Sequence, residues 1–164
     1  MKLAISVLAA AATLLAGCSA FLAPSITTGT TSDAVRAKLG APSDERTIAG
    51  GTRAWDYVNG PLGHTTWRIS FDGGNRVSRV EQLLTETAFL GLRSGETDKN
   101  ATLGRLGRPA QISNFPNLRE EVWTYRFMDG SFYKLGDIAF DAQSGKLKYV
   151  STYLDPAYYN SNDT

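Results

Sequence analysis

The sequence predicts an α+β fold built from two tandem repeats. Each repeat is a short helix (or helix pair) followed by a three-stranded antiparallel meander, with the helices on one side of the sheet. A Leu-Gly-x-Pro motif occurs twice, at 39–42 and 106–109, and a Trp-x-Tyr motif follows each time, at 55–57 and 123–125. The offset between matching motifs rises from 67 to 70 residues along the chain, so the copies differ by single-residue insertions.

Each copy is predicted to open with a short helix. Thr31 or Ser32 can cap the first helix, because a side-chain oxygen accepts hydrogen bonds from the free N–H groups of the first turn. Thr97 or Asp98 can do the same in the second copy. A glycine followed two residues later by proline is typical of a helix C-terminus and ends both segments. Segment 85–92 is expected to form a further short helix.

Three strand-like segments follow each of these helices. They alternate apolar and polar residues and are separated by Gly- and Asn-rich turns, as in hairpins. The predicted strands span 53–58, 65–71 and 76–84 in the first copy and 121–128, 131–140 and 146–154 in the second. A unit of about 60 residues buries too little surface to be stable alone. We therefore expect the copies to share one core and one continuous sheet.

The Trp-x-Tyr motifs allow two interpretations. Trp55, Tyr57, Trp123 and Tyr125 could form an aromatic binding platform together with Trp67 and Phe132, or they could form the core between sheet and helices. We favour the core for the first four. The opposite face would then be exposed to a partner, and its predicted partner-binding residues are Asp56, Thr66, Arg68, Thr124 and Arg126. Segment 155–164 lacks apolar periodicity and is predicted to be a disordered tail.

Composition excludes several function classes. The chain has 17 Lys and Arg against 16 Asp and Glu, which gives no electrostatic footprint for nucleic acid. One cysteine cannot form a disulfide framework, and one histidine leaves a metal site or a Ser/His/Asp triad without partners. His64 follows a Gly- and Pro-containing turn and is predicted to be a solvated loop residue. We expect no enzyme activity, cofactor or metal; a hydrolase using His64 is the least favoured hypothesis.

The N-terminus is predicted to be a lipoprotein signal peptide over residues 1–17. Lys2 precedes an uncharged stretch rich in Ala and Leu that is too short to span a bilayer comfortably. The stretch ends in Leu15-Ala16-Gly17-Cys18, which resembles the bacterial lipobox. This resemblance implies acylation of Cys18, cleavage before it and a lipidated tether over 18–28. Ser19, rather than Asp, after the cysteine implies transport to the outer membrane.

The lipobox, the Leu-Gly-x-Pro helix ends and the Trp-x-Tyr strands together resemble the SmpA/OmlA (BamE-like) outer-membrane lipoprotein family. The resemblance covers two repeats, 29–84 and 85–154. It implies a lipid-anchored protein of a Gram-negative outer membrane that faces the periplasm and acts as a non-catalytic scaffolding or protein-binding module. The implied partners are envelope proteins, with the β-barrel assembly machinery as one candidate. The family's unit is single, so its partner surface does not transfer residue by residue.

Duplication of such a unit also resembles, in architecture, the secreted β-lactamase inhibitor proteins. In those proteins two repeats present an aromatic sheet face to an enzyme. The alternative function is therefore an inhibitor or binding module for a periplasmic enzyme.

Overall fold

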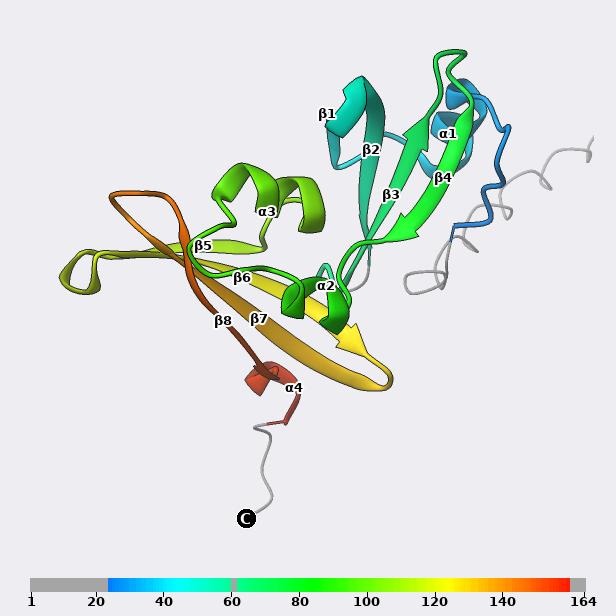
Figure 1. Ribbon diagram of the computed structural model, residues 1–164. Coiled ribbons are helices and arrows are strands. Elements are labelled where there is room, and N and C mark those ends of the chain that lie inside the picture. Colours follow the sequence, from blue (N-terminus) through cyan, green and yellow to red (C-terminus); the bar gives the residue numbers. More distant parts are fainter. Residues whose placement is uncertain (1–23, 60–61, 160–164) are drawn as a thin grey trace, which may run out of the picture.

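The computed structural model describes residues 24–59 and 62–159 (Figure 1). Within these residues the chain forms an α+β fold with two separate four-stranded antiparallel sheets. The first sheet contains β1 (Asp44–Ile48), β2 (Thr52–Asn59), β3 (Thr65–Phe71) and β4 (Val77–Gln82). The second contains β5 (Gln111–Phe115), β6 (Glu120–Asp129), β7 (Phe132–Asp141) and β8 (Leu147–Leu154). In both sheets the strands pair in chain order.

The described residues contain four α-helices, of which the first and third begin and end where the capping residues predict. They are α1 (Ser32–Leu39), α2 (Glu86–Leu90), α3 (Lys99–Leu106) and α4 (Pro156–Tyr159). Thr31 caps α1 and Asp98 caps α3, each by accepting a hydrogen bond from a backbone N–H of the first turn. Gly40 and Gly107 end these two helices with φ angles of 80° and 76°, a region that favours glycine.

Two details of the predicted arrangement are wrong. Each sheet has a fourth strand, β1 or β5, and the two sheets are separate where one continuous sheet was expected. Both extra strands are short and rich in polar residues, so their sequences lack the apolar alternation that marks the other strands. A 3₁₀ turn, Ala49–Gly51 or Pro116–Leu118, folds each of them back as a hairpin on the following strand.

The aromatic residues of the Trp-x-Tyr motifs form the core of each half. Trp55, Tyr57, Trp123 and Tyr125 are each no more than 5% exposed, which confirms the core interpretation. Counterpart residues make the same contacts. The ring centroids of Trp55 and Phe71 are 4.7 Å apart at 69°, and those of Trp123 and Phe140 are 5.0 Å apart at 64°.

The helix ends are joined to the sheets in the same way in both halves. The hydroxyl of Tyr57 donates to the carbonyl of Gly40 at 3.3 Å, and that of Tyr125 donates to the carbonyl of Gly107 at 3.0 Å. These bonds satisfy carbonyl oxygens at the C-termini of α1 and α3, where the helix itself provides no donor. Each Trp-x-Tyr strand therefore holds the Leu-Gly-x-Pro turn of its own half.

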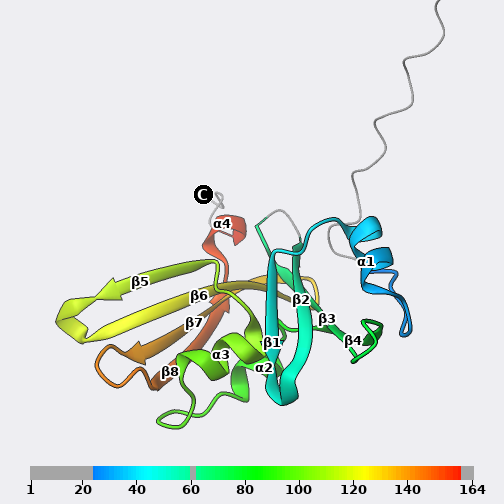
Figure 2. The same cartoon turned by 90° about the horizontal axis from the view of Figure 1, so that it is seen from above.

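The two halves meet where the polar face of the first sheet packs against helix α3 of the second half. In Figures 1 and 2, α1 lies on one side of the first sheet and the second half lies on the other side. Helices α2 and α3 cover the aromatic face of the second sheet and stand between the two sheets (Figure 1). The polar face of the first sheet is thus covered by the chain itself.

The segment predicted to be a disordered tail differs from expectation in its first part. Asp155 is 1% exposed, and α4 follows it directly. Tyr158 of α4 stacks on Tyr133 of β7 with ring centroids 4.0 Å apart. This aromatic contact fixes a segment that has no apolar periodicity. Residues 160–164, the signal peptide and Cys18 lie outside the described residues.

Candidate functional site

The five predicted partner-binding residues divide into two groups. Asp56, Thr66 and Arg68 are at most 3% exposed, so the prediction that they form an open surface is wrong. The C-terminus of α3 lies directly against them: a Cβ atom built on Gly107 would be 3.3 Å from Oδ2 of Asp56. A side chain at this position would crowd the carboxylate, and the φ of 76° at Gly107 also favours glycine.

A buried ion-pair network joins the halves at this contact. Asp56 accepts two hydrogen bonds from Arg68, at 2.7 Å from Nε and 2.8 Å from Nη2. Arg68 also donates through Nη1 to the carbonyl of Gly104, and Arg46 donates to the carbonyl of Leu103 at 2.8 Å. Carbonyls in the last turn of a helix carry partial negative charge, and the carbonyl of Leu103 accepts from Arg46 in addition to the N–H of Gly107. The two arginines therefore bind the C-terminus of α3 to the first sheet.

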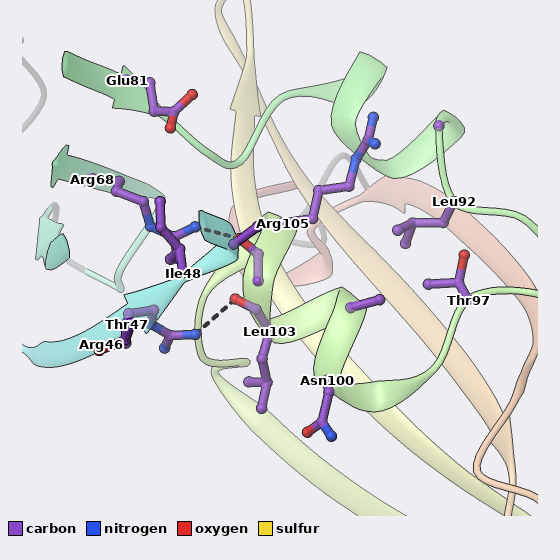
Figure 3. Close-up of a pocket in the computed structure, with 14 residues that line it drawn as sticks. Arg46, Thr47, Ile48, Arg68, Glu81, Leu92, Thr97, Asn100, Leu103 and Arg105 are labelled. Carbon is purple, nitrogen blue, oxygen red and sulfur yellow. Dashed lines mark hydrogen bonds between the residues drawn. The ribbon is translucent and has the colours of Figure 1, made fainter. Parts of the chain in front are cut away.

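A cleft of about 770 Å³ opens beside this network (Figure 3). One wall comes from β1, β3 and β4 of the first sheet, and the other comes from α3 and the residues just after α2. Three arginines line the cleft, together with one carboxylate and three neutral polar side chains: Arg46, Arg68, Arg105, Glu81, Thr47, Thr97 and Asn100. Both halves are needed to form it.

The second sheet has a face that none of the described helices covers along its length (Figure 1). We call it the outer face and define it by five apolar or aromatic residues that share one side of the sheet through the strand register: Phe115, Val122, Leu135, Tyr149 and Tyr153. Phe115, Tyr149 and Tyr153 are 44%, 47% and 39% exposed. Phe115 lies on the edge strand β5, and Tyr149 and Tyr153 lie on the opposite edge strand β8. Exposed apolar side chains on an open sheet face are typical of interaction sites.

Carboxylates hold the two exposed tyrosines of the outer face in place. Tyr153 donates its hydroxyl hydrogen to Asp137 at 2.8 Å, and Tyr149 lies 3.2 Å from a carboxylate oxygen of Glu120. Burial, reinforced by Asp137, raises the pKa of Tyr153 to about 12. Its hydroxyl therefore stays protonated and bound at neutral pH. Such fixed rings lose little rotational freedom when a partner binds.

The remaining predicted partner-binding residues, Thr124 and Arg126, belong to this same face. Both are half-buried. Thr124 donates to Asp137 at 2.6 Å, and Arg126 lies 3.3 Å from a carboxylate oxygen of Asp155. The predicted open polar face is therefore present in the second sheet, where none of the described helices covers it, and absent from the first sheet, where α3 covers it.

His64 is not the solvated loop residue that was predicted. Its side chain is completely buried, with the ring centroid 4.8 Å from that of Tyr133 and 5.4 Å from that of Tyr158. Its Nε2 atom lies 4.0 Å from a carboxylate oxygen of Asp155. Strand β7 and helix α4 of the second half close over the loop, which the local turn sequence does not reveal.

Stability should depend on pH through His64. Burial lowers the pKa of His64. The negative charge of Asp155 raises this pKa in part, and the positive charge of Arg126 lowers it further. The folded state thus binds the proton less readily than the unfolded chain, so stability is intact above the ordinary pKa of 6.5 and decreases as pH falls below it. We expect a lower free energy of unfolding at about pH 5.5 than at about pH 7.5 in urea titrations. His64→Gln should flatten this difference; an equally steep difference in the variant would contradict the assignment.

The part of the chain that the structure describes contains no group of three or more His, Cys, Asp or Glu side chains arranged to hold a metal ion. Among the same residues, no helix has both the length and the apolar character needed to cross a bilayer.

Comparison with known proteins gives two solved structures that resemble this chain only weakly. A scan against family models and a search of curated proteins both give no match. YjgB, a DUF4309 family protein from Bacillus subtilis, is 17% identical with a TM-score of 0.29 and covers 76% of this chain and 78% of its own. A candidate β-lactamase inhibitor protein from Streptococcus mutans is 15% identical with a TM-score of 0.31, covering 77% and 85%. At these TM-scores neither likeness bears on what this chain does, and the SmpA/OmlA resemblance stays a prediction.

Sequence reasoning missed the exposed aromatics of the outer face. Tyr149 and Tyr153 lie four residues apart in a predicted strand, and such a spacing puts both on one side of a sheet. That signal was present in segment 146–154. Arg68 was singled out only as part of an open face, and Arg46 and Arg105 gave no comparable signal, because the two halves that form the cleft are far apart in sequence.

Proposed function

We propose that this chain is a non-catalytic protein-binding module that docks its partner on the outer face of the second sheet. One observation carries the proposal. The outer face presents fixed, exposed aromatic residues, whereas the counterpart face of the first sheet is filled by the chain itself. Tyrosine and phenylalanine are enriched in protein interfaces, and rigid aromatic residues provide much of their binding energy.

The chemistry of the outer face defines the kind of partner. Phe115, Tyr149 and Tyr153 offer apolar surface, and the carboxylates of Glu120 and Asp137 lie beside it with further acceptor positions. A folded protein with an apolar strip flanked by hydrogen-bond donors would complement this surface. We infer that the two halves derive from one duplicated unit and that the second half keeps the docking face open.

The location of the chain is part of the proposal. An acyl anchor on Cys18 would keep the module next to the outer membrane on its periplasmic side. The tether predicted over 18–28 is shorter than expected, because Ile26 is 9% exposed and belongs to the core of the first half. Burial of about 0.8 kcal/mol per methylene makes several acyl chains a stable anchor. The chain would then meet envelope proteins, with the β-barrel assembly machinery as one candidate.

Site-specific cross-linking in intact cells tests the proposal. A photoreactive amino acid at position 149 or 153 should give one discrete cross-linked species, and the same group at Leu90, which is 72% exposed on α2, should give none. Phe115→Ala should weaken the cross-link at both tyrosines. Absence of a cross-link at 149 and 153, or an equal one at Leu90, would contradict docking on the outer face.

Membrane fractionation tests the anchor. The Cys18→Ala variant should no longer be recovered with the outer membrane, and unchanged recovery there would refute the anchor.

The identity of the cross-linked species separates the candidate functions. A component of the assembly machinery would support a role in outer-membrane protein assembly. A soluble periplasmic enzyme, together with inhibition by the wild-type chain and none by Tyr149→Ala, would support the inhibitor alternative, which the aromatic content of the outer face also favours. A second copy of this chain would replace both with self-association.

A further inference from the structure

The cleft between the first sheet and α3 carries more guanidinium groups than carboxylates can balance. Arg46 pairs with both Asp44 and Asp56, and Arg68 pairs with Asp56. Arg108 reaches Asp44 at 3.0 Å. Glu81, at the other wall, is paired with Arg79 at 2.8 Å. The carboxylates around the cleft are therefore already in use.

Arg105 differs from the other arginines of the cleft. Its Nε donates to the carbonyl of Ala88 at 2.8 Å, which fixes the side chain across the residues that follow α2. In the described residues it forms no ion pair with a carboxylate. The guanidinium ends in a fork of two further nitrogens, a geometry that matches the two oxygens of a carboxylate.

The rest of the lining adds polar and apolar contacts. Thr97 and Asn100, at the beginning of α3, offer hydroxyl and amide groups, and Ile48, Leu92 and Leu103 offer apolar surface (Figure 3). The volume of about 770 Å³ lies within the range of small-molecule sites. Charged side chains lie on both walls, Arg46, Arg68 and Glu81 on one and Arg105 on the other, with apolar side chains among them. Such a lining suits a ligand that has both a charged and an apolar part.

We propose that this cleft binds a small organic carboxylate with a short apolar body. The carboxylate would pair with the guanidinium of Arg105, and the apolar body would lie against Ile48, Leu92 and Leu103. A single unpaired guanidinium matches a monoanion better than a phosphate dianion, which would need further donors. Because both halves form the walls, the bound ligand would stabilise their contact.

Calorimetric titration with octanoate tests the cleft in the full chain. We expect one saturable site and an increase in Tm. Arg105→Gln should weaken octanoate binding about tenfold, since a hydrogen bond to a charged group is lost. Arg119→Gln, which removes an exposed arginine outside the cleft, should leave binding unchanged. Ala101→Phe, which adds volume to the α3 wall, should block binding without removing a charge.

Three results would overturn the proposal. Octyltrimethylammonium, with the same chain and the opposite charge, binding as well as octanoate would mean that only the apolar part is recognised. Octyl phosphate or inorganic phosphate binding more tightly than octanoate would replace the carboxylate. Absence of saturable octanoate binding would refute the proposed site. The cleft lies on the side of the second sheet opposite the outer face, so Tyr149→Ala should retain octanoate binding, and failure here would leave the docking proposal untouched.

Discussion

Asp56→Ala should destabilise the fold by about 3–5 kcal/mol, since it leaves buried arginines without their carboxylate. Asp56 is 1% exposed and accepts from Arg68 at 2.7 Å and 2.8 Å, while Nε of Arg46 lies 3.2 Å away. The loss would be a large part of the stability of an ordinary domain. Chemical unfolding followed by tryptophan fluorescence measures it.

The second half provides a matched control for this substitution. Thr124 and Asp137 pair across β6 and β7 at the register position that Asp56 and Arg68 occupy in the first sheet. Because that position lies on the open outer face, Asp137→Ala should cost only about 1 kcal/mol. Replacing both partners, as Asp56→Leu with Arg68→Met, should recover much of the loss. Equal costs at Asp56 and Asp137 would show that the first sheet is not covered as described.

Phe89→Ala is the second large effect and should destabilise the protein by about 3–5 kcal/mol. Phe89 is fully buried, and its ring centroid lies 4.6 Å from that of Phe127 and 5.8 Å from that of Tyr125. This side chain attaches α2, which connects the halves, to the second sheet. Leu90→Ala, the neighbouring exposed position, should change the free energy of unfolding by less than about 0.5 kcal/mol.

Gly136 gives an independent check on the position of the Phe89 ring. A Cβ atom built on Gly136 would lie 2.7 Å from Cε1 of Phe89, closer than side chains approach one another. Gly136→Ala should therefore cost about 1–3 kcal/mol. Combining it with Phe89→Leu should be less harmful than the sum of the two, as thermal unfolding of the three variants would reveal. Strict additivity would mean that the two residues are not in contact.

The parts of the fold that could be predicted are those that local chemistry determines. Thr31 and Asp98 cap helices because their oxygens accept first-turn hydrogen bonds, and Gly40 and Gly107 end helices because they adopt positive φ. The Trp-x-Tyr alternation predicted which side of each sheet carries the aromatic core. β1 was missed because it begins with three charged residues, Asp44, Glu45 and Arg46, which give no strand signal. The segment becomes a strand through its hairpin with β2.

The site could not be predicted to the same extent, because it depends on contacts between distant segments. A polar residue such as Asp56 is usually solvated, so its place beside Trp55 and Tyr57 suggests an open face. Its burial follows from Gly104 and Gly107, about fifty residues away, and from an arginine of opposite charge on the next strand. One signal hinted that the two sheets differ. Asp56 pairs with Arg68 across β2 and β3, whereas the counterpart of Asp56 in the second sheet is the neutral Thr124.

We propose that the chain acts through the outer face of the second sheet. Hydroxyl-radical footprinting of the purified chain and of the chain in the cell envelope tests it most directly. We predict that Tyr149 and Tyr153 are oxidised rapidly in the purified protein and become protected in the envelope, while Leu90 is oxidised equally in both. Equal oxidation of the two tyrosines in both samples, or protection confined to Leu90, would contradict it.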